Sequence, residues 1–179
     1  MRSPIKDARV RNDPDWKDRI LRQLEHYRKW APFYRAVTEL LGDALGARET
    51  SITRLNHRAL KACCTFLGLE RDIQIFSEMG VGIEPPQGPG DWALSISVAL
   101  GAKEYVNPPG GVEIFDQAQY RAAGVPILFL KNRLKPYDQQ RDTFEPGLSI
   151  IDVLTFNDPK VANELIDDYV TSGTGVFPQ

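Results

Sequence analysis

The sequence predicts an α/β protein in which N-terminal helices are followed by a small, mainly parallel, three-layer α/β sheet. Apolar residues recur at helical spacing over the first 70 positions, and short apolar runs then alternate with helical patterns of about ten residues. The chain has 179 residues, 42% hydrophobic and 26% charged. This composition is typical of a folded protein, and we expect a single domain over 1–179.

The helical part is expected over about 13–68. Asp13-Pro14 predicts a helix start, because a capping residue precedes a proline at the first helical position. Ala31-Pro32 predicts an interruption, since proline disfavours helix at the preceding residue. A third helix is expected over 51–66, with Gly68 as its C-terminal cap. The stripe that buries the first helix consists of Trp16, Ile20, Leu24 and Tyr27.

The α/β part is expected over about 70–170, followed by a mobile tail over 171–179. Strands are predicted over 73–76, 104–106 and 125–130, and they alternate with helices over 91–100 and 115–123. Two further helices are expected after residue 148 and over 159–169. Because strands that alternate with helices pair in parallel through right-handed crossovers, the three strands are expected to be neighbours in one sheet.

Several classes of function are not indicated. The formal net charge of −2 gives no electrostatic reason to expect nucleic-acid binding. No apolar run approaches the roughly 20 residues that span a bilayer, and the N-terminus lacks an apolar signal segment, so a cytoplasmic protein is expected. His26 and His57 have no second ligand at metal spacing, so no metal site is expected, and no motif indicates a cofactor. The adjacent Cys63 and Cys64 are interpreted as two small apolar residues on a helix.

Candidate site residues follow the predicted strands, because ligands in open parallel sheets bind beyond the carboxyl ends of the strands. Ser77 follows the first predicted strand, the pair Gly110-Gly111 the second, and Lys131 the third. The long connection after the third strand also carries Tyr137 and Gln139. The alternatives are capping or solvation for Ser77, a plain tight turn for Gly110-Gly111, and an ordinary polar surface loop for the connection after the third strand.

Asp152 stands inside the apolar run Ile150–Leu154, where an unpartnered carboxylate would be very costly to bury. Ser149-Ile-Ile-Asp152 has the form of a capping box at a helix start, with serine as the cap and an acidic residue three positions later. The pattern therefore predicts that Asp152 caps its own helix. A catalytic role for this carboxylate stays open beside that interpretation.

The chain resembles the WbqC-like protein family, and the resemblance covers most of residues 10–170. The most specific match runs from Pro136 to Asn157, where an aromatic residue and a glutamine precede a motif around F-x-P-x-L-S-I-I-D. The stretch that opens many members, HQPxYLPWxGYF, is not present, and Asp158 stands where glycine is common. The chain is therefore expected to be a fragment or a shortened member. The other matching stretches are YRKWAPFYRAV, the helix around Leu55-Asn56, FSEMG, LGAKEYVNPPGGVEIFD and AAGVPILF.

The resemblance implies an acyl or aminoacyl transferase that acts on amino-sugar nucleotides in bacterial O-antigen or related biosynthesis. Its partners would be small molecules, the amino sugar and the acyl donor. Asp152 and Tyr137 are the expected catalytic residues. The alternatives are a non-catalytic binding module and a partner-dependent subunit that lacks the N-terminal catalytic segment. A homodimer is expected, because one sheet edge would otherwise be uncovered. The expected substrate-binding residues are Ser77, Tyr105, Gly110, Gly111, Lys131, Gln139 and Ser149.

Overall fold

The computed structural model describes residues 4–11, 13, 15–46 and 48–177, and these residues form helices and a small sheet. The chain divides into two compact units. Unit 1 comprises residues 1–79 and 134–165, and unit 2 comprises residues 80–133 and 166–179. Each unit is thus built from two separate stretches of the chain, and the sequence prediction of one domain over 1–179 stays a prediction.

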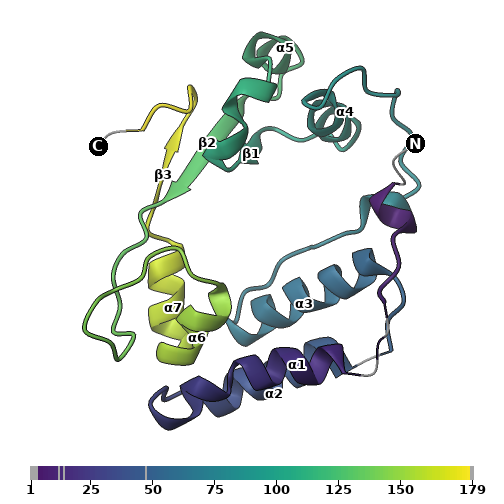
Figure 1. Cartoon of the computed structure of the whole chain (residues 1–179). Coiled ribbons are helices and arrows are strands. Elements are labelled where there is room, and N and C mark those ends of the chain that lie inside the picture. The colour runs from purple at the N-terminus through teal and green to yellow at the C-terminus, as the bar shows by residue number, and fades with distance from the viewer. Residues whose placement is uncertain (1–3, 12, 14, 47, 178–179) are drawn as a thin grey trace. The chain divides into compact units, whose positions relative to one another are not determined.

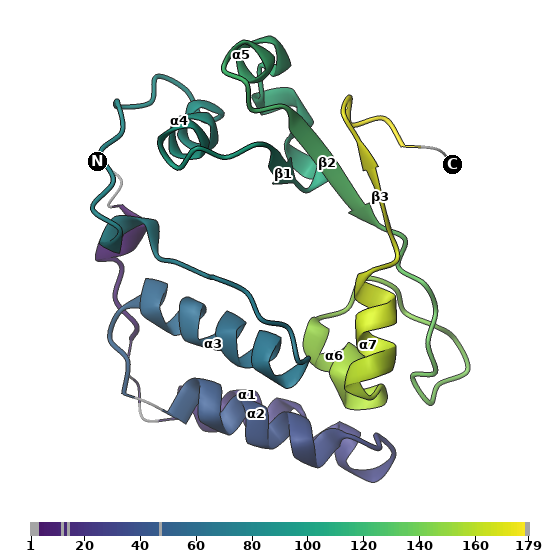
Figure 2. The same cartoon turned by 180° about the vertical axis from the view of Figure 1, so that it is seen from behind.

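Unit 1 is helical. Its helices are α1 (Trp16–Gln23), α2 (Tyr34–Gly46), α3 (Ile52–Phe66), α6 (Ile150–Phe156) and α7 (Pro159–Ile166), the last of which ends at the unit boundary. Helices α2 and α3 run side by side in both views (Figures 1 and 2), and α6 packs against α2. A backbone hydrogen bond from Phe33 N to Thr155 O, 3.1 Å long, joins the start of α2 to α6.

The helix ends follow from local sequence. The side chain of Ser51 accepts a hydrogen bond from Arg54 N at the start of α3, and Gly68 adopts a φ of +69° after its end. Glycine reaches this left-handed conformation without steric cost, so the prediction of a C-cap at Gly68 is confirmed. The predicted opening at Asp13-Pro14 includes Pro14, which lies outside the described residues. Helix α1 begins at Trp16.

Tyr27 lies beyond α1, in a 3-10 helix over Glu25–Lys29. It is buried with Ala31 and Phe156, and its ring meets that of Phe156 edge-on at a centroid distance of 5.5 Å. The predicted apolar stripe therefore continues past the end of α1, through a tighter turn, into the contact with α6.

Unit 2 contains helices α4 (Asp91–Ala99) and α5 (Gln117–Ala122) and a three-stranded sheet of order β1-β2-β3. Strand β1 (Tyr105–Asn107) pairs in parallel with β2 (Ile127–Asn132), with Val106 opposite Leu128. Strand β3 (Tyr169–Ser172) pairs antiparallel with β2, with Leu130 opposite Thr171. The sheet is therefore mixed, and the prediction of a mainly parallel sheet is wrong in this respect. Thr171 and Ser172, which the sequence assigns to a mobile tail, belong to β3.

The predicted strand over 73–76 is also wrong. Ile73 belongs to unit 1, outside any strand, and its carbonyl oxygen lies 2.8 Å from Nε2 of His57 on α3. Phe76–Glu78 then forms a short 3-10 helix. An extended segment can thus satisfy its backbone through a helix side chain instead of a neighbouring strand, and four alternating residues do not distinguish the two cases.

The core of unit 2 lies on one face of β2. Ile127 and Phe129 are buried and pack with Tyr120 of α5, whereas Leu128 and Leu130 are only partly buried. The continuous apolar run 125–130 therefore buries alternate residues, as expected for a strand with one covered face.

Candidate functional site

The candidate site is centred on Asp152 in the first turn of α6. Ser149 precedes this helix, and its Oγ accepts a hydrogen bond from Ile151 N at 3.3 Å. The prediction that Ser149 caps the helix is confirmed. Asp152 has a different role from the one that its capping-box position predicts, because its carboxylate oxygens bond to side chains from other parts of unit 1.

Three side chains donate hydrogen bonds to the Asp152 carboxylate, which is only 3% exposed. Tyr27 Oη donates to Oδ2 over 2.5 Å, and Tyr137 Oη donates to Oδ1 over 2.5 Å. Gln139 Nε2 lies 3.2 Å from Oδ1. We call Asp152, Tyr27, Tyr137 and Gln139 the Asp152 cluster. The three hydrogen bonds offset the free-energy cost of burying the Asp152 carboxylate in an apolar helix turn. The apolar neighbours of Asp152 in the sequence already predicted that this carboxylate needs partners.

Gln139 also holds the loop that carries it. Its Oε1 accepts from Glu145 N at 2.9 Å, and its Nε2 lies 3.0 Å from Glu145 O. The side-chain amide thereby pairs with the backbone of Glu145 as a neighbouring strand would. Gln140, the next residue, has a φ of +54°, a strained value for a residue with a Cβ. The paired amide of Gln139 therefore fixes the loop in a conformation that its local sequence does not favour.

The two tyrosines remain protonated far above neutral pH. Burial, followed by the hydrogen bond to Asp152, raises the pKa of Tyr27 to about 12, and Arg141 acts in the opposite direction. Burial and the hydrogen bond to Asp152 likewise raise the pKa of Tyr137 to about 12. Both phenols are therefore donors to Asp152 at pH 7 and not bases in their own right.

The Asp152 cluster has a closed side and a more open side. Tyr27 is 8% exposed and lies within the aromatic packing around Phe156. Tyr137 is half-buried and contacts Phe144 edge-on, with ring centroids 5.4 Å apart. Of the two tyrosines that reach the carboxylate, Tyr137 is therefore the more exposed.

The structure places the remaining predicted residues in two groups. Ser77 lies in unit 1, exposed in the 3-10 helix that replaces the predicted strand. Unit 2 holds Tyr105, Gly110, Gly111 and Lys131. The expectation that the candidate residues follow three strands is thus wrong for Ser77, because residues 73–76 form no strand.

Within unit 2, the predicted residues have local structural roles. Tyr105 Oη donates to Asn107 Oδ1 over 3.0 Å, and Lys131 Nζ lies 5.8 Å from the centre of the Phe177 ring. Gly110 and Gly111 belong to a 3-10 helix over Pro109–Ile114. A Cβ at Gly111 would come within 2.9 Å of the Phe115 ring and 3.0 Å of Asn107 Nδ2, so packing alone explains that glycine.

Tyr27 belongs to the Asp152 cluster, although the sequence predicts it only as part of the apolar stripe of the first helix. Its hydroxyl reaches a residue 125 positions away. The only local signal is the residue type, since a buried tyrosine usually needs a partner for its hydroxyl.

Together, these contacts define a mixed helix-and-sheet protein with a buried, polar, carboxylate-centred cluster. The model of the WbqC-like protein family matches residues 1–164, so the chain belongs to this family. Comparison with curated proteins and with solved structures found no significant match.

Two further observations concern the described part of the chain only. No helix there has the length and apolar character needed to cross a membrane. No group of three or more His, Cys, Asp or Glu side chains among those residues is arranged to hold a metal ion.

Proposed function

We propose that this WbqC-like chain is a cytoplasmic bacterial enzyme that transfers an acyl or aminoacyl group to the amine of an amino-sugar nucleotide, in O-antigen or related polysaccharide biosynthesis. Family membership supports the assignment, together with a buried carboxylate that is linked to a half-buried phenol. The single observation that carries it is the hydrogen bond from Tyr137 to Asp152, because acyl transfer to an amine requires a route for one proton.

The proposed reaction forms a bond between the sugar nitrogen and the acyl carbon and breaks the bond from that carbon to its leaving group, which departs with the electron pair. The nitrogen loses one proton. Tyr137 Oη accepts this proton as its own hydroxyl proton passes to Asp152 Oδ1, 2.5 Å away. A phenol whose pKa is about 12 is too weak an acid to start the reaction ionised, so it serves as a relay and Asp152 as the base.

The other predicted residues take supporting roles in this proposal. Gln139 positions the relay, because its amide contacts both Tyr137 Oη and Asp152 Oδ1 at 3.2 Å. Ser149 fixes the first turn of α6. Ser77 is proposed to contact substrate in unit 1, and Tyr105, Gly110, Gly111 and Lys131 to do so within unit 2.

The test is a product assay with mass spectrometry. The full chain is incubated with uridine-diphosphate 4-amino sugars and with acetyl- or glycyl-coenzyme A as donors. We expect N-acylated sugar nucleotide from the wild type, and a loss of at least about 100-fold in rate for Tyr137→Phe and Asp152→Asn.

Tyr34→Phe is the matched control for this assay. Tyr34 packs against the buried residues Tyr27, Ala31 and Phe156, and its hydroxyl makes no hydrogen bond among the described residues. It should keep the wild-type rate. Absence of product from the wild type with every donor, or full activity in Tyr137→Phe, contradicts the proposal.

A non-catalytic role is the second candidate, and the burial of Asp152 favours it. All three donors to the carboxylate come from the protein itself, and the carboxylate is 3% exposed. On this reading the Asp152 cluster only holds the 134–149 loop against the helices. Asp152→Asn would then lower stability and leave the binding of sugar nucleotides unchanged.

A further inference from the structure

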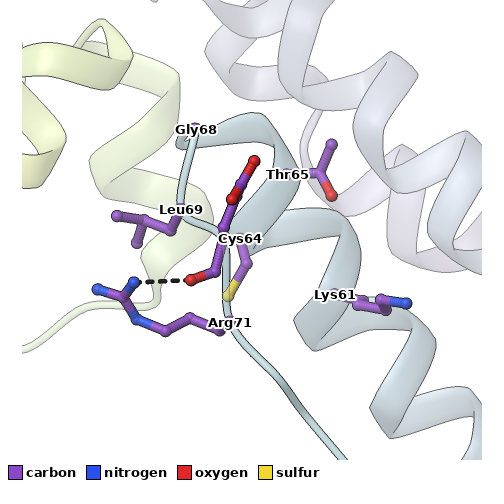
Figure 3. A pocket seen from close by; sticks show the side chains of 7 residues that line it. Lys61, Cys64, Thr65, Gly68, Leu69 and Arg71 are labelled. Atoms are coloured by element: carbon purple, nitrogen blue, oxygen red, sulfur yellow. Dashed lines mark hydrogen bonds between the residues drawn. The ribbon is translucent and has the colours of Figure 1, made fainter.

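A separate cavity of about 450 Å³ lies at the C-terminal end of α3 in unit 1, within the size range of small-molecule sites. It shares no residue with the Asp152 cluster. Figure 3 shows the side chains around it, with that of Cys64 between those of Lys61 and Arg71. The cavity is lined by Lys61, Cys64, Thr65, Gly68, Leu69, Glu70 and Arg71.

The end of α3 builds this cavity. Lys61, Cys64 and Thr65 are three and four residues apart, so they share one face of the helix. Leu69 N donates to Cys64 O over 2.8 Å and Gly68 N donates to Thr65 O over 3.0 Å, the two bonds of a Schellman motif. With Gly68 at a φ of +69°, this motif turns the chain so that residues 69–71 return beside the helix face.

The lining combines a small apolar surface with an excess of positive charge. Lys61 and Arg71 carry positive charges and Glu70 a negative one, which leaves one net positive charge. Arg71 Nη1 donates to Glu70 O over 2.8 Å, which fixes the orientation of the guanidinium through one of its five N–H groups. The carbonyl oxygens of Cys64 and Thr65 already accept the hydrogen bonds of the helix cap.

We propose that this cavity binds a small organic anion, in which Lys61 and Arg71 hold the charged group and Cys64 and Leu69 contact the apolar part. The ligand class is a carboxylate or a phosphate monoester. Thr65 supplies a hydroxyl that can donate to either, and Arg71 presents the planar, paired N–H groups that both anions accept. This site goes beyond the proposed transfer reaction and does not depend on it.

The test follows the backbone amide signals of the ¹⁵N-labelled full chain during titration with three probes: phenyl phosphate, benzoate and benzyl alcohol. Saturable shifts at residues 64–71 are expected with one or both anions, and the better anion identifies the ligand class. Benzyl alcohol should bind at least about fivefold more weakly, since it has the apolar ring without the charge. Added sodium chloride should weaken the anions only.

Charge variants give the sign of the effect. Lys61→Gln and Arg71→Gln should each weaken the anion about fivefold, while Glu70→Gln should strengthen it. Lys29→Gln is the control, because Lys29 is an exposed lysine of unit 1 outside the cavity. Equal affinity in all four variants overturns the proposal, and so does binding of benzyl alcohol as tight as that of the anions.

Cys64 provides a second readout in the Cys63→Ser chain, which keeps one thiol. Alkylation of Cys64 by N-ethylmaleimide should slow as the anion fills the cavity, and the Lys61→Gln change should remove that protection. In the reciprocal Cys64→Ser chain, burial raises the pKa of the remaining Cys63 thiol, so its slow alkylation should not respond to the anion. Protection of Cys63 and Cys64 to the same extent would show a global effect on the fold and contradict a local site.

Discussion

Removing the hydroxyl of Tyr27 should destabilise the protein more than removing that of Tyr137, Tyr120 or Tyr34. In Tyr27→Phe the ring keeps its edge-on contact with Phe156, so the change isolates the hydrogen bond to Asp152 Oδ2. Hydrogen bonds to charged groups contribute about 1.5–3 kcal/mol. Among the described residues Oδ2 accepts only from Tyr27, so we expect a loss near the upper end of that range.

Tyr137→Phe should cost less, about 1.5 kcal/mol. It also removes a 2.5 Å hydrogen bond to Asp152, but Oδ1 retains Gln139 Nε2 at 3.2 Å. The remaining donor keeps that oxygen partly satisfied. The difference between the two variants therefore measures how much a second donor protects a buried carboxylate.

Two further tyrosines provide the controls. Tyr120 Oη donates over 3.0 Å to the neutral carbonyl of Gly90, so Tyr120→Phe should cost about 1 kcal/mol. Tyr34→Phe should cost close to nothing, because the Tyr34 hydroxyl has no partner among the described residues. All four variants remove one tyrosine hydroxyl. The acceptor that is left is a carboxylate oxygen with no other donor for Tyr27, a carboxylate oxygen with a second donor for Tyr137 and a neutral carbonyl for Tyr120, whereas Tyr34 leaves no acceptor among the described residues.

The assay is urea unfolding followed by far-UV circular dichroism, with the slope m compared between variants. A loss of about 3 kcal/mol in Tyr27→Phe corresponds to a fall of roughly 6–12 °C in the thermal midpoint for a chain of this size. If Tyr27→Phe costs no more than Tyr120→Phe at an unchanged m, the carboxylate does not need its buried donor and the reasoning is refuted.

Three other predictions follow from the same contacts. The contribution of Tyr27 and Tyr137 to the free energy of unfolding should stay level up to pH 10 and be lost as pH rises from 10 through about 12, because burial and the hydrogen bonds to Asp152 raise the pKa of both phenols to about 12 in the folded chain, against about 10 when unfolded. Tyr120 adds to the same fall, since burial raises its pKa to about 12 as well. Tyr27→Phe should therefore reduce the fall in alkaline denaturation curves without abolishing it, and an unaltered curve contradicts this. Ser149→Ala should cost about 0.5–2 kcal/mol in urea unfolding, because Ile151 N loses its acceptor, while Ser77→Ala, an exposed serine elsewhere in unit 1, should cost less. Light scattering should report a homodimer at micromolar concentration, since β1 and β3 each pair on one side only among the described strands; a monomer at high concentration refutes this.

The helices could be predicted because their signals are local. The boundaries of α3 depend on Ser51 and Gly68, which act through hydrogen bonds within four residues. The start of α6 likewise depends on Ser149, whose side chain accepts from Ile151 N. Periodicity and capping act within one or two turns, so a single sequence contains all the information that these elements need.

The sheet could be predicted only in part, because strand pairing depends on distant segments. The parallel pair of β1 and β2 connects residues about 20 positions apart through α5, an alternation that the sequence shows. Strand β3 is four residues long, lacks a buried apolar face and pairs with residues about 40 positions away. Conversely, Ile73–Phe76 alternates but finds no strand partner. Neither outcome is encoded in the segment itself.

The candidate site was predicted one residue at a time but not as an arrangement. Because the neighbours of Asp152 are apolar, its carboxylate was expected to need a hydrogen-bond donor. A backbone amide at the start of its own helix was the nearest donor in the sequence. The actual partners are 125, 15 and 13 positions away, and they arrive from a 3-10 turn and a long loop. The local sequence pattern therefore identified Asp152 as a carboxylate that needs hydrogen-bond donors, but it predicted the wrong donors.

The Asp152 cluster has two candidate roles, one structural and one catalytic. Each role involves a different oxygen of the Asp152 carboxylate. Oδ2 accepts from Tyr27, which is buried against Phe156. Oδ1 faces Tyr137, which is half-buried and linked to the loop through Gln139. Substituting Asp152 changes both oxygens, so it cannot distinguish a structural from a catalytic function. Tyr27→Phe removes the donor to Oδ2, and Tyr137→Phe removes one of the two donors to Oδ1. If the cluster is purely structural, Tyr27→Phe and Tyr137→Phe should lose activity only in proportion to their loss of stability. If it is a proton relay, Tyr137→Phe should lose turnover although it is expected to be more stable than Tyr27→Phe.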